Sequence, residues 1–129
     1  MALDIEISKG QRGICSVKLS GALDSETSAQ FASAIESALT DSHVGALHLE
    51  MQHLKYIDSM GLGAIVKVRK AVEARGGVLT IVGAQPQILK VFEFVGMLPA
   101  GTVFANRQEA DIYLAMIQGS VPGGGTAAG

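Results

Sequence analysis

The sequence predicts a single α/β domain with a mixed sheet of four or five strands and helices packed mainly on one face. Three observations support this fold class. The length of 129 residues suits one compact domain with its own hydrophobic core. Several runs alternate apolar and polar residues, which is typical of half-buried strands. The order β-β-α-β-α-β-α-β-α alternates strands with helices and therefore needs crossover connections.

Five segments have the alternation or the apolar run of strands: residues 3–7, 14–20, 46–51, 78–82 and 102–104. A short Gly-containing loop joins the first two, which predicts a hairpin. The third carries His48 and Glu50 opposite its apolar residues, on the wetter face of the sheet. The fourth is nearly all apolar and is placed in the interior of the sheet. The last is short and is placed at an edge.

Four stretches follow the 3.6-residue period of helices: from Asp24 or Ser25 to Leu39, then residues 59–75, 86–95 and 106–117. Asp24 or Ser25 caps the first. Glycines end the second, and a proline opens the third. A capping box that starts at Asn106 opens the fourth. We expect one domain over residues 1–118 and a disordered, Gly-rich tail over residues 119–129, which has too little apolar content to fold alone.

Composition excludes several classes of protein. No apolar run reaches 18 residues, so we expect no membrane span. Acidic residues stand where a secretory signal needs basic ones. The one cysteine, Cys15, excludes an internal disulfide framework and is placed in the core. The net charge of −2 argues against direct binding of nucleic acid. Together these features predict a cytoplasmic protein.

The most unusual segment runs from Tyr56 to Gly63 and places Ser59 at the junction of a loop and a helix, after Asp58. A glycine inside a helix costs up to about 1 kcal/mol relative to alanine, so Gly61 and Gly63 predict the close approach of a backbone or a partner. A serine at a helix start is usually an N-cap. The alternative is a serine that is modified or contacted. A phosphate there would meet the positive end of the helix and would bring about −1.5 to −2 charges to any docked surface.

Several motifs match one known family in order and spacing: Leu19–Asp24 with Thr27, Leu54–Ser59 leading into Gly61–Gly63, Gly76–Leu79, Pro86, Phe92, Gly96–Leu98 and the helix with Glu109 and Ala110. Over about residues 3–117 the sequence resembles the STAS domain (sulfate transporter and anti-sigma factor antagonist), most closely the stand-alone bacterial anti-sigma factor antagonists. The resemblance implies a regulatory protein. We therefore expect no enzyme activity, no catalytic residue, no metal site and no cofactor.

The resemblance also implies roles for residues of this sequence. Ser59 falls on the family's phosphorylation site. The kinase is the anti-sigma factor, which uses ATP, and a metal-dependent serine phosphatase reverses the reaction. The unphosphorylated form binds the anti-sigma factor and so releases a sigma factor. Asp24 falls on an acidic position beside the serine, and the expected docking surface comprises Asp24, Asp58, Ser59, Met60 and Gly61, with the outer face of the following helix.

Two positions depart from the family pattern. Met60 stands where the family usually has Ser or Thr, and Glu50 stands where it usually has Asp or Asn. Both departures bear on the identity of the partner more than on the fold. A methionine at such a position suits a contact surface because its side chain adapts to varied shapes.

Other interpretations remain open. The chain could be a STAS subunit that serves a transporter or scaffold complex without phosphorylation, or an enzyme that uses Ser59, although the G-x-S-x-G motif of esterases is absent. A metal site from His43, His48 and His53 is disfavoured, because offsets of five place strand residues on opposite faces. We expect these histidines to be solvated.

Overall fold

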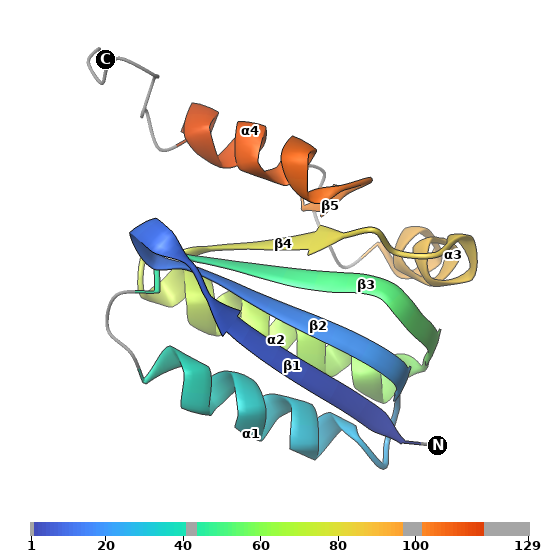
Figure 1. Cartoon of the computed structure of the whole chain (residues 1–129). Helices are drawn as coiled ribbons and strands as arrows, with labels where there is room; N and C mark the ends of the chain where they lie inside the picture. The colour runs from blue at the N-terminus through green and yellow to red at the C-terminus, as the bar shows by residue number, and fades with distance from the viewer. Residues whose placement is uncertain (1, 41–43, 97–101, 118–129) are drawn as a thin grey trace.

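The computed structural model describes residues 2–40, 44–96 and 102–117, which form a twisted sheet of five strands flanked by four α-helices (Figure 1). The strands are β1 (Leu3–Lys9), β2 (Ile14–Leu23), β3 (Ala46–Ile57), β4 (Val78–Val82) and β5 (Val103–Phe104). The helices are α1 (Ser28–Leu39), α2 (Ser59–Ala74), α3 (Pro86–Val95) and α4 (Arg107–Ile117). The predicted tail at 119–129 lies outside the described residues, so the domain boundary stays a prediction.

The sheet is mixed, as predicted. Its strands lie in the order β1-β2-β3-β4-β5, and the hairpin pair β1 and β2 is antiparallel, whereas the three following pairs are parallel. A crossover with a helix joins each parallel pair, which is the connection that parallel strands need. The apolar β4 has a neighbour on both sides, and the short β5 lies at an edge. These placements confirm the sequence-based assignment of both strands.

Strand β3 is twice as long as predicted, since it continues beyond residue 51 to Ile57. From Met51 onward its buried residues are Met51, Leu54 and Ile57, spaced by three instead of two. The register with β2 shifts twice over this stretch, and such irregularities insert an extra residue on one strand and break the alternation of faces. The period of two therefore fails where the strand continues, and the segment before Ser59 is strand rather than loop.

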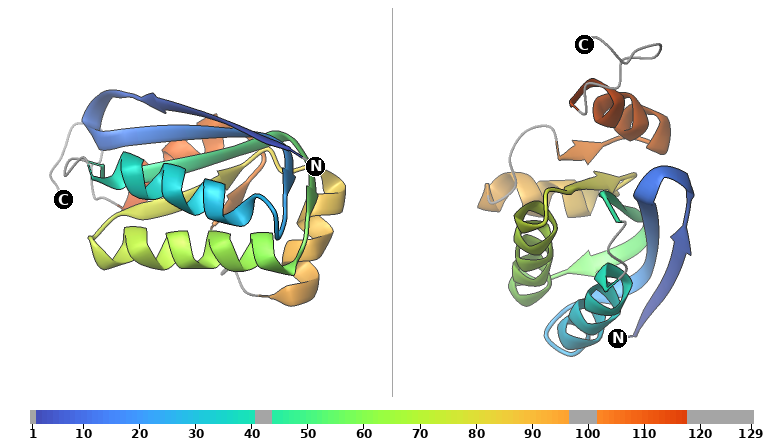
Figure 2. Two further views of the ribbon diagram at one scale, coloured as in Figure 1. Left: turned by 90° about the horizontal axis from the view of Figure 1, so that it is seen from below. Right: turned by 90° about the vertical axis from the view of Figure 1, so that its left-hand side faces the viewer.

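Helices α1 and α2 cover one face of the sheet, side by side, and α3 lies at the end of the sheet (Figures 1 and 2). The core forms between this helical layer and the strands, and its fully buried side chains include Leu19, Leu47 and Leu49 from the sheet and Phe31, Ile35, Leu62 and Ile65 from the helices. Cys15 belongs to this core, as the sequence predicts. The helices on this face position the candidate site.

Helix α4 packs against the opposite face and corrects one prediction (Figure 2). His48 is fully buried rather than solvated: its Nδ1 pairs with the Thr80 hydroxyl, and its Nε2 lies 3.1 Å from a carboxylate oxygen of Asp111 on α4. Glu50 forms an ion pair with Arg107 of the same helix at 3.5 Å. The polar residues of this face predict a wetter surface, but α4 covers them and contributes Asp111 and Arg107 as partners, while Thr80 of β4 supplies the third.

Candidate functional site

The candidate site forms where β2 and β3 end. The two strands are parallel neighbours, with Leu23 paired to Ile57, so the residues that follow each strand emerge at the same edge of the sheet. The backbone N–H of Asp58 donates to the carbonyl oxygen of Leu23 at 3.3 Å. The topology thus brings Asp24 and Asp58 to adjoining loops, although they are far apart in sequence.

The carboxylate of Asp58 connects these two loops. One oxygen accepts a hydrogen bond from the backbone N–H of Gly61 at 2.9 Å, which makes Asp58 the N-cap of α2. The other oxygen accepts from the backbone N–H of Ser25 at 3.3 Å. The residue before Ser59 therefore starts the helix and also holds the loop that follows β2.

Asp24 organises its own loop. Its Oδ1 accepts hydrogen bonds from the backbone N–H groups of Glu26 at 2.9 Å and Thr27 at 3.1 Å, and the Thr27 hydroxyl donates to the carbonyl of Ala22 at 2.8 Å. This turn delays the helix, so α1 begins at Ser28 instead of directly after Asp24 or Ser25. Thr27 directly precedes α1, so neither Asp24 nor Ser25 is its N-cap residue, although the Asp24 carboxylate accepts backbone N–H groups of the turn that leads into the helix.

Ser59 is the first residue of α2 and its side chain is exposed. Within the described residues its hydroxyl has no hydrogen-bond partner. The interpretation of Ser59 as an N-cap is wrong, since Asp58 fills that position. The serine is left with an accessible, unbonded hydroxyl at the positive end of a helix.

The other predicted docking residues differ in exposure. Met60 is 58% exposed, and Asp24 and Asp58 are half-buried. Gly61 is buried: a β-carbon there would lie 2.1 Å from the carbonyl oxygen of Leu23, so a side chain would push α2 away from β2. The close approach predicted for this glycine is to a backbone of the same chain. Gly61 lies beneath the surface, where the absence of a side chain lets α2 pack closely against the end of β2.

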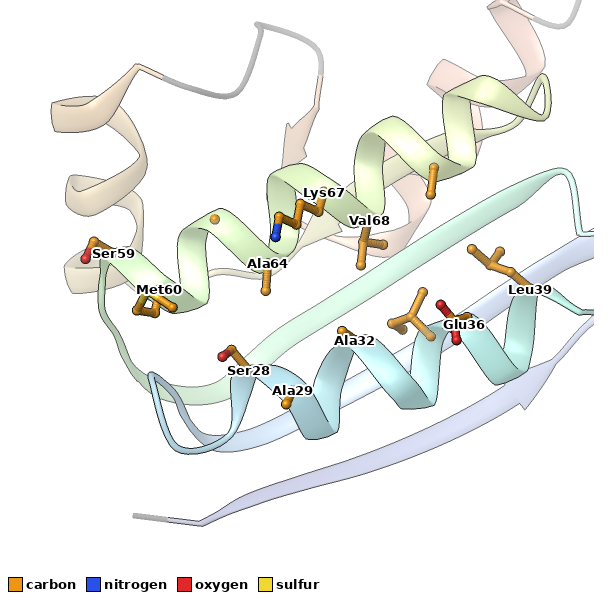
Figure 3. Close-up of a pocket in the computed structure, with 13 residues that line it drawn as sticks. Ser28, Ala29, Ala32, Glu36, Leu39, Ser59, Met60, Ala64, Lys67 and Val68 are labelled. Atoms are coloured by element: carbon orange, nitrogen blue, oxygen red, sulfur yellow. The ribbon is translucent and has the colours of Figure 1, made fainter.

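A groove between α1 and α2 adjoins Ser59, and sequence reasoning did not find it (Figure 3). This α1/α2 groove has a volume of about 590 Å³, and its walls are lined mainly by apolar side chains, among them Ala29, Ala32, Leu39, Met60, Ala64 and Val68. A β-carbon added to Gly63, which also lines it, would meet nothing within 4 Å. The alanines on the outer sides of both helices were the sequence signal, but only the packing of the two helices turns them into a groove.

The described residues offer little for other chemistry at this site. The groove is lined by two ionisable side chains, Glu36 and Lys67, and by no histidine that could serve Ser59 as a general base. In the described ranges, no three His, Cys, Asp or Glu side chains gather as metal ligands, and His43 lies outside those ranges. None of the described helices is long and apolar enough to cross a membrane.

The fold and this site define a class of protein: a small α/β domain that presents an exposed serine at a strand–helix junction beside an apolar groove. The comparison with known families agrees. The STAS domain family matches residues 7–110, and the chain belongs to that family. The resemblance stated from the motifs is thereby confirmed.

Individual relatives are more distant. The chain is 27% identical over 110 residues to an anti-sigma F factor antagonist of Paenibacillus polymyxa, which covers 85% of this chain and 93% of the relative. The fold matches the anti-sigma factor antagonist SpoIIAA in its unphosphorylated form, with a TM-score of 0.67 at 22% identity over 90% of this chain and 99% of the other. It also matches part of a murine solute carrier 26 anion transporter in its inward-facing state, with a TM-score of 0.69 at 22% identity over 84% of this chain and 19% of the transporter.

Proposed function

We propose that this chain is an anti-sigma factor antagonist switched by phosphorylation of Ser59. In the unphosphorylated state it binds an anti-sigma factor that is also a serine kinase, and a sigma factor is released. Transfer of phosphate from ATP to Ser59 ends that binding, and a metal-dependent serine phosphatase restores it. The protein acts in the cytoplasm, binds no nucleic acid directly and catalyses no reaction itself.

The observation that carries this proposal is the state of Ser59. Its side chain is exposed, its hydroxyl has no partner among the described residues, and Asp58 performs the capping that a serine would otherwise provide. A kinase can therefore reach the hydroxyl without breaking a hydrogen bond of the fold. The names of the relatives, in Paenibacillus polymyxa and elsewhere, support the same function.

A phosphate at Ser59 would act on binding more than on folding. It would stand at the N-terminus of α2, where the helix dipole favours negative charge. It would also add about −1.5 to −2 charges beside the carboxylate of Asp58 and near the loop of Asp24. A partner surface that fits the neutral serine then meets a concentration of negative charge and a larger group.

In the direct test, the protein is incubated with ATP, magnesium and the cognate anti-sigma kinase, and its mass is then measured by mass spectrometry. We expect one added phosphate, on Ser59, and none on Ser59→Ala. Ser28 provides a matched control, because it also faces the groove near Ser59, and Ser28→Ala should be labelled as the wild type is. A label that persists in Ser59→Ala would overturn the site.

The alternative is a STAS subunit of a transporter or scaffold complex that is not phosphorylated. The observation that supports this alternative is the fold match to part of an anion transporter. The same experiment separates the two functions, because the alternative predicts no phosphate transfer from any anti-sigma kinase. Stable binding to a transport protein that Ser59→Asp leaves unchanged would favour the alternative.

A further inference from the structure

The α1/α2 groove has a shape that can bind a third helix. Both walls are helices, α1 with 12 residues and α2 with 16, and α1 and α2 run side by side on one face of the sheet (Figures 2 and 3). Twelve helical residues extend about 18 Å, so the groove offers roughly three turns of apolar wall. The volume of about 590 Å³ is bounded by small side chains such as Ala32 and Ala64, which leave room for larger side chains from outside.

The two walls carry opposite charges. Glu36 projects from α1 and Lys67 from α2, and both line the groove and are exposed. Neither forms an ion pair with another described residue. An occupant that complements this groove therefore needs an apolar face between a basic residue on one flank and an acidic residue on the other. That pattern is the amphipathic helix, which enters grooves by apolar residues at i, i+3 or i+4 and i+7.

We propose that the α1/α2 groove receives an amphipathic helix of the anti-sigma partner, with a basic flank toward Glu36 and an acidic flank toward Lys67. This inference rests on the proposed function and adds the kind of surface that the partner must offer. The groove is continuous with the phosphorylation site, because Ser59 and Met60 belong to its lining at one end (Figure 3). Met60 is more than half exposed and supplies an adaptable apolar side chain where the bound helix begins.

The position of Ser59 explains how phosphorylation would release the helix. An apolar segment seated in the groove covers the end at which Ser59 lies. A dianionic group there must be desolvated or must expel the segment, and desolvating an unpaired charge is costly. The apolar residues that would bind the helix and the serine whose phosphorylation would release it thus lie on one continuous surface.

Helix α4 of a second copy fits the groove less well. The exposed apolar residues on its helix α4 are Ile112 and Met116, one turn apart. Insertion of that helix into the groove of another copy would join two different faces, so a closed dimer would need both insertions at once about a two-fold axis. The flank of α4 beside these residues carries Glu109 and Asp111, and Asp111 already pairs with His48. A helix that complements the charges of the groove needs one basic flank and one acidic flank, whereas Glu109 and Asp111 are both acidic.

The test fills the groove without disturbing the fold. Gly63→Leu places a large side chain in the groove from a position where a β-carbon meets nothing within 4 Å. Ala74→Leu is the matched control, since Ala74 is exposed on α2 but does not line the groove. The probe is a synthetic amphipathic helix of about 15 residues, with leucines at i, i+3 and i+7, lysines on one flank and glutamates on the other.

In a titration of the isotope-labelled protein followed by NMR, we expect amide shifts at Ala32, Gly63, Ala64 and Lys67. Gly63→Leu should weaken the binding at least about tenfold and Ala74→Leu less than about twofold, as for a central contact against a peripheral one. Lys67→Glu should also weaken it, because both walls then carry negative charge. A peptide that gives no shifts, or whose shifts map to α4, would overturn the proposal.

The same variants with the anti-sigma kinase separate this proposal from the function on which it rests. If Gly63→Leu binds the kinase as tightly as Ala74→Leu does, the groove is not the seat, whereas phosphorylation of Ser59 would still uphold the function. If the wild-type chain is neither bound nor phosphorylated, the function fails and this inference with it. If the wild type self-associates and Gly63→Leu is monomeric, a second copy is the occupant and the proposal is overturned.

Discussion

The carbonyl oxygen of Leu23 fills the space that a side chain at Gly61 would need, because a β-carbon there would lie 2.1 Å from that oxygen. This contact lets the first turn of α2 rest directly on the end of β2. It sets the distance between the loop that carries Asp24 and the helix that begins with Ser59. The geometry of the site therefore depends on a residue that is itself buried.

Replacement of Gly61 by alanine should destabilise the protein. The added methyl group forces α2 away from β2, and overpacking of this kind costs about 1–3 kcal/mol. Gly63→Ala, two residues along the same helix, should instead stabilise the protein by about 0.5–1 kcal/mol, since its β-carbon has free space and alanine favours a helix. Urea denaturation measures both. Changes of the same sign in the two variants would contradict the packing described.

The carboxylate of Asp58 should contribute both to stability and to the order of the neighbouring loop. Asp58→Ala removes the cap of α2 and the acceptor for the N–H of Ser25, so we expect a loss of about 1–2 kcal/mol. Amide hydrogen exchange at Ser25 should become faster. Asp58→Asn keeps an oxygen for the cap and should lose less. Asp4→Ala, at an exposed position of β1, serves as the control and should change neither quantity.

Burial of His48 should make stability depend on pH. Desolvation lowers the pKa of His48 below its ordinary value of 6.5, and the hydrogen bond and charge of Asp111 oppose this only in part; Arg107 adds to the lowering and Glu50 opposes it. The unfolded chain then binds a proton that the folded protein does not. The stability from neutral His48 is complete above pH 6.5 and falls as the pH drops below it, by at most about 1.4 kcal/mol per pH unit.

Unfolding free energies at pH 7.5 and pH 5.5 test this prediction, since the interval lies above the range in which ordinary carboxylates titrate. His48→Gln should lower stability at the higher pH and flatten the pH dependence. His53→Gln, at an exposed position of β3, should leave the pH dependence of the wild type intact. An equal slope in His48→Gln and the wild type would show that another group is responsible.

The elements that sequence predicted well are those whose signal is local. The β1–β2 hairpin follows from two alternating runs around a glycine loop, and α3 follows from Pro86 at its first turn and Gly96 at its end, where the backbone is left-handed (φ 65°). The unusual segment at Ser59 was also visible, because glycines and a hydroxyl at a helix start are local features. The local pattern does not show whether Asp58 or Ser59 caps the helix, and the structure assigns that role to Asp58.

The features that sequence missed depend on contacts between distant segments. The length of β3 follows from the irregular register with β2, which spaces Met51, Leu54 and Ile57 by three. The burial of His48 follows from α4, which lies more than 50 residues away along the chain. Glu50 is longer than the Asp or Asn that the family usually has at this position, and it forms an ion pair with Arg107 of the same helix. The α1/α2 groove needs the relative placement of two helices.

Substitution of Ser59 should separate stability from binding. Its exposed hydroxyl has no hydrogen-bond partner in the part of the chain that the structure describes, so Ser59→Ala should change the unfolding free energy by less than about 0.5 kcal/mol. In Ser59→Asp the helix dipole favours the new charge and the neighbouring Asp58 opposes it, so the melting temperature should again stay close to that of the wild type.

Binding should respond differently to the two variants. Ser59→Ala should bind the anti-sigma kinase as the wild type does, whereas Ser59→Asp should bind at least about tenfold more weakly, since a charge now stands at the end of the apolar groove. Calorimetric titration measures both affinities, and thermal unfolding of the same samples supplies the stability. If Ser59→Asp loses stability and affinity together, the serine supports the fold. If it loses affinity alone, the charge at residue 59 controls the partner, because the fold beneath it is unchanged.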